Sequence, residues 1–140
     1  MPRSNPWQSY RTIATQTASP GQLVLMLYEG AIRFLEQSLT GFEHEDPLEF
    51  NLTINNNIQR AQAIILELNA SLNMEQGGEV AATLRPLYDY FHRRLQEANI
   101  NKQKAPILEV IERVRVLRDG WAEMLGKGQS DAQPSQLAAA

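Results

Sequence analysis

Cysteine is absent from this chain of 140 residues, and histidine occurs only twice. Without cysteine there is no disulfide, no thiolate nucleophile and no cysteine-ligated zinc, which is compatible with a reducing compartment. A basic excess is lacking too, because the net charge is -3 and the arginines are scattered along the chain. We therefore expect no nucleic-acid partner, since phosphate backbones are bound by concentrated positive charge.

Long apolar runs are missing as well. The segment Met1–Tyr10 is polar and has no apolar core of the kind that a signal peptide needs. No later run approaches the length of a membrane span. We expect a cytosolic protein with no membrane-inserted segment.

Residues able to do chemistry are few, and each has a simpler structural interpretation. Glu43–Asp46 has the residue types of a metal site, but consecutive positions point in different directions and Asp46 is better placed to cap a helix. His92 stands beside two arginines, at what we expect to be the polar edge of a helix. The pair Gly77–Gly78 lacks the lysine and hydroxyl of a phosphate-binding loop. We predict no catalytic residue, no metal site and no cofactor.

Four segments carry apolar residues at three- and four-residue spacing, and none shows the sustained alternation of a strand. The expected helices run from about Pro20 to Leu39, from Pro47 to Leu72, from Val80 to Ala98, and to Leu125 from a start left open between Asn101 and Pro106. Pro106 favours the later start, because an interior proline costs a helix about 3 kcal/mol. The fold class is therefore all-α.

The first two helices have well-marked starts. Ser19 can cap the free amides, Pro20 suits the first helical position, and Gln22 can reach back to the cap. The second helix repeats this pattern, with Asp46 as its cap. Gly41 is expected to end the first helix.

These helices predict an antiparallel up-down four-helix bundle over residues 19–125, because short connections force neighbours to run in opposite directions. A short helical arm over residues 1–18 is expected before the bundle. In it Trp7, Tyr10 and Ile13 have the spacing of an amphipathic turn that packs on the bundle. Residues 126–140 are polar and alanine-rich, and we expect a flexible tail.

Two helices have more apolar residues than a bundle core needs, which is about three in seven. The excess comprises Ile64, Ile65, Leu66 and Leu68 in the second helix, and Val110, Ile111, Val114, Val116 and Leu117 in the fourth. Both helices should expose apolar side chains on more than one face. Three coverings are open: long side chains with the arm, a second copy in a homodimer, or an amphipathic helix of a partner.

An ordered set of short motifs runs through almost the whole folded part, from about Tyr10 to Leu125. It comprises Tyr10, Thr17–Pro20, Leu23–Leu35, Ala61–Leu68, Gly77–Ala81, Leu87–Tyr90, Arg94–Leu95, Ala98–Asn99 and Trp121. This set resembles the FliS family, the flagellar export chaperones that bind flagellin. The departures are the Asn55–Asn57 run in the second helix, Pro106 and the tail, and they bear on the regularity of the second and fourth helices.

The resemblance implies a four-helix antiparallel bundle with a short N-terminal element, no cofactor and no catalysis. It implies that the client is the C-terminal segment of flagellin, unfolded in the bacterial cytosol, and that export gate components are further partners. The family's N-terminal tyrosine is implicated in client binding, and Tyr10 occupies that place. Together with the apolar excess, this predicts the partner-binding residues Tyr10, Ile13, Ile58, Ile65, Leu68, Val110 and Val114. The alternative is a self-associating structural bundle without a flagellin client.

Overall fold

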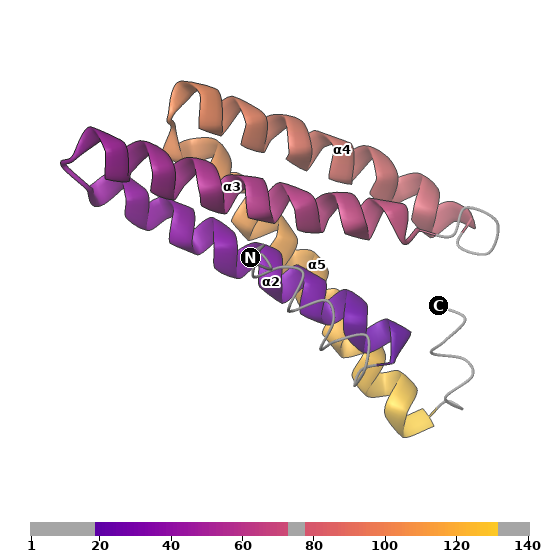
Figure 1. Cartoon of the computed structure of the whole chain (residues 1–140). Helices are drawn as coiled ribbons and strands as arrows, with labels where there is room; N and C mark the ends of the chain where they lie inside the picture. Colours follow the sequence, from indigo (N-terminus) through magenta and orange to yellow (C-terminus); the bar gives the residue numbers. More distant parts are fainter. Residues whose placement is uncertain (1–18, 73–77, 132–140) are drawn as a thin grey trace, which may run out of the picture.

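Four long α-helices make up the described part of the chain (Figure 1). They are α2 (Pro20–Thr40), α3 (Pro47–Ala70), α4 (Gly78–Asn101) and α5 (Lys104–Asp131), with a short 3-10 helix, η1 (Gly41–Glu43), after α2. The computed structural model describes residues 19–72 and 78–131, and these ranges contain no strand. The predicted all-α class is confirmed.

The helices form an antiparallel bundle in which each has two neighbours. α2 packs against α3 and α5, and α4 packs against the same two helices. α2 and α4 therefore lie diagonally across the bundle, as do α3 and α5. Figure 1 shows successive helices running in opposite directions, with α2 along α5 and α3 along α4. The predicted up-down arrangement is confirmed.

The predicted starts of the first two helices are confirmed in detail. The Ser19 hydroxyl accepts a bond from the Gln22 amide at 3.2 Å, and the Gln22 side chain accepts one from the Ser19 amide at 3.2 Å. At the start of α3, the Asp46 carboxylate accepts a bond from the Glu49 amide at 3.0 Å. These bonds satisfy amides that have no partner inside the helix, so local sequence decides where α2 and α3 begin.

Gly41 follows α2 as expected, but for another reason. Its φ of -62° is right-handed, so no left-handed turn requires glycine there. A Cβ at this position would lie 2.8 Å from Cγ1 of Ile54 and 3.0 Å from Cβ of Thr53. The missing side chain thus lets the end of α2 approach the first turns of α3.

The fourth helix begins at Lys104, between the two starts that the sequence left open. α4 ends at Asn101, and Lys102 follows with φ 50°. The Gln103 amide then donates to the Ala98 carbonyl at 3.1 Å, which is the bond of a Schellman helix end. Pro106 falls in the first turn of α5, where its missing amide hydrogen breaks no helical bond.

The predicted flexible tail is wrong for its first residues, because α5 continues to Asp131. The apolar spacing stops at Leu125 and therefore predicts the end of the helix there. A glycine such as Gly126 costs a helix about 1 kcal/mol. This cost weakens a formed helix without ending it, because each further residue adds one backbone hydrogen bond. Residues 132–140, and the predicted arm of residues 1–18 with Trp7, lie outside the described residues, so these domain boundaries remain predictions.

Neither the asparagine run of α3 nor the interior proline of α4 breaks its helix. α3 is continuous through Asn55–Asn57, where the Asn57 side chain donates to the Thr53 carbonyl at 2.9 Å. α4 is continuous through Pro86, which removes one backbone donor from the helix interior. Both helices therefore remain regular at these positions.

The core lies between all four helices. Its largest fully buried side chains are Leu27, Tyr28, Leu35, Ile54, Ile58, Ile64, Ile65, Tyr88, Phe91, Leu95, Ile107 and Val110. The hydroxyl oxygens of Tyr28 and Tyr88 are 2.6 Å apart, so one polar contact joins the diagonal helices α2 and α4 inside this core. Tyr88, Phe91 and Leu95 form the core stripe of α4.

One end of the bundle is closed between α2 and α5. The Trp121 indole donates to the Gly21 carbonyl at 2.7 Å, and Leu125 is buried beside it. A Cβ on Gly21 would lie 2.7 Å from Cδ2 of Leu125. Glycine in the first turn of α2 therefore allows the C-terminal part of α5 to pack closely against it.

Candidate interaction surface

The five helix residues predicted to bind a partner lie in the core. Ile58, Ile65 and Leu68 of α3, and Val110 and Val114 of α5, are at most 2% exposed. In the closed bundle these side chains touch other core residues, so contact with a partner would require the helices to move apart. Periodicity identifies an apolar stripe, but a helix with two such stripes does not reveal which one faces inward. The binding role of these five residues stays a prediction.

The two arm residues in the same prediction, Tyr10 and Ile13, lie outside the described residues. Their role also stays a prediction. The surface described below therefore consists only of side chains from α3, α4 and α5.

Exposed apolar side chains concentrate on the two helices for which an excess was predicted. They are Leu48, Leu52 and Leu66 of α3, Leu108, Val116 and Met124 of α5, and Val80 and Ile100 of α4. Leu66 is 54% exposed although Ile65 beside it is buried, and Val116 is 68% exposed although Val114 is buried. The prediction that both helices show apolar side chains on more than one face is confirmed.

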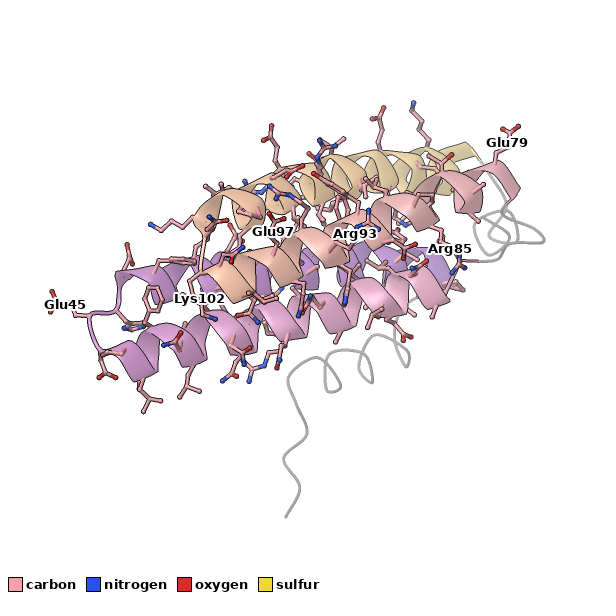
Figure 2. The ribbon with its side chains drawn as sticks, turned by 90° about the horizontal axis from the view of Figure 1, so that it is seen from above. Glu45, Glu79, Arg85, Arg93, Glu97 and Lys102 are labelled. Carbon is pink, nitrogen blue, oxygen red and sulfur yellow. The ribbon has the colours of Figure 1, made fainter. Side chains whose placement is uncertain are left out.

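Four of these side chains, which we call the turn-end residues, belong to one end of the bundle. They are Leu48, Leu52, Ile100 and Leu108, at the start of α3, the end of α4 and the start of α5. Lys104 of α5 lies over the Phe42 ring of η1, 5.7 Å from its centroid, so the two turns are neighbours. Figure 2 shows Glu45 and Lys102 at this end and Glu79 at the other. Sequence reasoning missed the turn-end residues as a group because they come from three helices, and the periodicity of one helix does not show which ends meet.

The edge between α4 and α5 is closed by a charged cluster. The Glu109 carboxylate accepts bonds from the Tyr90 hydroxyl at 2.6 Å, from Nε of Arg94 at 2.8 Å and from Nε of Arg113 at 3.0 Å. The Tyr90 bond lowers the pKa of Glu109, and the bond and charge of Arg94 lower it further. A carboxylate held ionised by three donors is a poor proton acceptor, so this cluster joins two helices and is not suited to acid–base catalysis.

The other chemical candidates have structural positions. Glu43–Asp46 is exposed at the α2–α3 turn, and Asp46 is the cap of α3. Across residues 19–72 and 78–131, no three residues of the types His, Cys, Asp and Glu are grouped so as to hold a metal ion. His92 lies half-buried on α4, where its backbone carbonyl accepts a bond from Gln62 of α3. Within the same ranges, no helix combines the length and the hydropathy needed to cross a membrane.

Comparison with known proteins adds an independent finding. The family model described as flagellar protein FliS matches residues 3–128. The flagellar secretion chaperone FliS of Bacillus subtilis is 36% identical over 131 residues, which cover 94% of each chain. That of Campylobacter jejuni is 36% identical over 76% of this chain and 80% of its own. That of Salmonella typhimurium is 33% identical over 81% of this chain and 82% of its own.

Proposed function

The chain belongs to the FliS family of flagellar secretion chaperones, and on this premise we propose that its client is the C-terminal segment of flagellin. The chaperone holds this disordered segment in the bacterial cytosol and prevents premature polymerisation. It then aids delivery to the flagellar type III export apparatus, whose gate components are its second partner. Neither role needs a cofactor or a catalytic residue.

The observation that carries the proposal is the exposed apolar side chains of α3 and α5, with Leu66 and Val116 each more than half exposed. Because α3 and α5 lie diagonally, a client segment that covers both must wrap around the bundle, and we call these side chains together the apolar surface. Fully burying a side chain of this kind is worth about 1.5–3 kcal/mol, so covering a half-exposed one gains about 1 kcal/mol. An amphipathic client segment that covers several of them gains enough to fold on the bundle. The entropy lost on ordering the segment limits the net affinity, which suits a chaperone that must release its client.

The arm completes the proposal. We infer that residues 1–17, with Tyr10 and Ile13, cover part of this surface when the chaperone is free and move when flagellin binds. Removing these residues should change the affinity for flagellin and leave the far-UV circular dichroism of the bundle intact. Unchanged affinity would show that the arm takes no part.

A binding experiment tests the client directly. Light scattering of purified chain mixed with flagellin should show a stoichiometric complex, and flagellin without its C-terminal segment should give none. The double variant Leu66→Gln and Val116→Gln should weaken binding about 30-fold, because it removes about 2 kcal/mol of apolar burial. Gln59→Ala and Glu112→Ala are matched controls, since both positions are exposed on the same two helices. Equal affinity of the double variant and the controls would contradict this surface as the binding site.

The alternative function is a structural bundle that associates with itself. The turn-end residues favour it, because four exposed apolar side chains near one end would also suit contact between two copies. The same light-scattering experiment separates the two functions. A dimer that forms without flagellin and does not bind it would support the alternative and refute the chaperone proposal.

A further inference from the structure

Side-chain amides cross the seam between α3 and α4 at regular intervals. Asn55, Gln62 and Asn69 stand seven residues apart on α3, and each makes a hydrogen bond to α4. Gln62 is 6% exposed, so its amide is almost fully removed from water. We call this set of three the amide ladder.

The partners of the amide ladder follow the same interval in the opposite direction. Asn55 Oδ1 accepts from Nδ2 of Asn99 at 2.9 Å, and Nε2 of Gln62 donates to the His92 carbonyl at 3.2 Å. At the third rung the bond at this interval is made by the backbone of Asn69, whose carbonyl accepts from Nη2 of Arg85 at 3.5 Å. One heptad forward on α3 thus corresponds to one heptad backward on α4 at every rung.

The rungs at Gln62 and Asn69 each have a second bond, one turn away on α4. Nε2 of Gln62 also reaches Oε1 of Gln96 at 3.3 Å, and Nδ2 of Asn69 donates to Oδ1 of Asp89 at 3.0 Å. Figure 2 shows the face of α3 and α4 on which this seam lies, with Arg85 and Arg93 along α4. The contacts therefore extend over most of the length of both helices.

The other seams of the described bundle are closed differently. Between α2 and α3, Arg60 lies over the Phe34 ring. Between α2 and α5, Arg115 pairs with Glu36 at 2.9 Å. The Trp121 bond to the Gly21 carbonyl, also between α2 and α5, and the Glu109 cluster between α4 and α5 each lie at one place along their seam. None of these contacts recurs at heptad intervals as the amides do.

The difference matters because an apolar stripe alone defines the register of two helices poorly. Apolar residues recur every three or four positions, so a displacement by one turn again opposes apolar side chains. The same displacement of α4 in one direction would place Asn55, Gln62 and Asn69 opposite three buried apolar positions, namely Leu95, Tyr88 and Ala81. Gln62 would then have its buried amide without a partner, which is strongly unfavourable, whereas the partly exposed amides of Asn55 and Asn69 would lose their bonds to α4.

We propose that the amide ladder locks the register of α3 and α4, selecting one pairing at some loss of stability. Oδ1 of Asn69, in the ladder, and Nδ1 of His92, the residue whose carbonyl Gln62 contacts, are buried with no hydrogen-bond partner among the described residues. A set of contacts that served stability alone would leave no such atoms unsatisfied. Polar residues at buried heptad positions fix register in other helical assemblies in the same way.

The test replaces the α3 amides by apolar side chains of similar size and measures the distance between the helices. The triple variant is Asn55→Leu, Gln62→Met and Asn69→Leu. Because the chain has no cysteine, spin labels can be attached at Gln59→Cys on α3 and Arg93→Cys on α4, both exposed positions. The unsubstituted ladder should give one narrow interspin distance. The triple variant should add a second population, displaced along the helices by about 5 Å, which is one helical turn.

The control and a second variant make the result decisive. Asn51→Leu makes the same chemical change at an exposed position of α3 whose amide bonds the Pro47 carbonyl of its own helix, and it should keep a single distance. Gln62→Met alone should already broaden the distance distribution, so an aggregating triple variant leaves the test intact. A single narrow distance in both ladder variants, accompanied by a lower unfolding midpoint, would show that the amides only stabilise and would overturn the proposal.

Discussion

The hydroxyl groups of Tyr28 and Tyr88 provide a sharp test of how the diagonal helices are held together. Both side chains are 2% exposed, and their oxygens are 2.6 Å apart. α2 and α4 otherwise meet α3 and α5 rather than each other. The perturbation is the removal of one hydroxyl or both, in Tyr28→Phe, Tyr88→Phe and the double variant.

The expected magnitudes follow from the burial of the pair. A single substitution leaves the remaining hydroxyl in the core without its partner, which should lower the free energy of unfolding by about 1–3 kcal/mol. The double substitution removes both polar groups and should be nearly neutral, with a loss below about 1 kcal/mol. The two single effects are therefore expected to be strongly non-additive.

Urea unfolding followed by circular dichroism measures these values, and an unchanged m-value would show that the surface exposed on unfolding is the same. The comparison of the three variants contains its own control, because each phenylalanine ring keeps the packing of the tyrosine. A double variant that loses as much stability as the two single variants together would refute the reasoning. It would mean that each hydroxyl has another partner or that the core collapses without them.

The remaining predictions concern pH and single positions. Burial raises the pKa of Tyr28 and Tyr88 above 10.0, so their contribution to the free energy of unfolding is complete below pH 10 and should be lost as the pH rises further. In urea unfolding above pH 10, the double phenylalanine variant should therefore lose less stability than the unsubstituted chain. The pKa of Glu109 is lowered from 4.5, so its contribution to the free energy of unfolding is present above pH 4.5 and is lost on acidification. Glu109→Gln should therefore flatten the decline of the urea midpoint below pH 4.5. Gly41→Ala should lower the free energy of unfolding, measured in urea, by about 1–3 kcal/mol, because the added Cβ would overlap Ile54. Gly120→Ala should raise it by up to about 1 kcal/mol, because no atom lies within 4 Å of the added Cβ. Lys102→Gly should raise the thermal midpoint, because glycine tolerates φ 50° and relieving the strain adds about 0.5–1 kcal/mol to the free energy of unfolding. A lower midpoint would mean that the lost bond from Lys102 to Asn99 outweighs the relief of strain.

Local features of the sequence were sufficient wherever one helix decides the outcome by itself. The caps at Ser19 and Asp46 depend on side chains within three residues of the amides they satisfy, so their pattern could be read directly. The four apolar stripes likewise indicated the number of helices and their antiparallel order. The start of α5 could not be read in this way, because it depends on Lys102 adopting a left-handed conformation that sequence rules assign to glycine.

The sequence alone determined the all-α class and the starts of α2 and α3, since each rests on residues close together in the chain. It also determined the family resemblance, which rests on an ordered set of short motifs. Only the tertiary structure decided which apolar stripe of α3 and α5 is buried, and it placed Ile58, Ile65 and Val110 inside and Leu66 and Val116 outside. It also decided the pairing of α3 with α4 through Asn55, Gln62 and Asn69. The physical reason is that burial and register are properties of two helices in contact, whereas periodicity is a property of one.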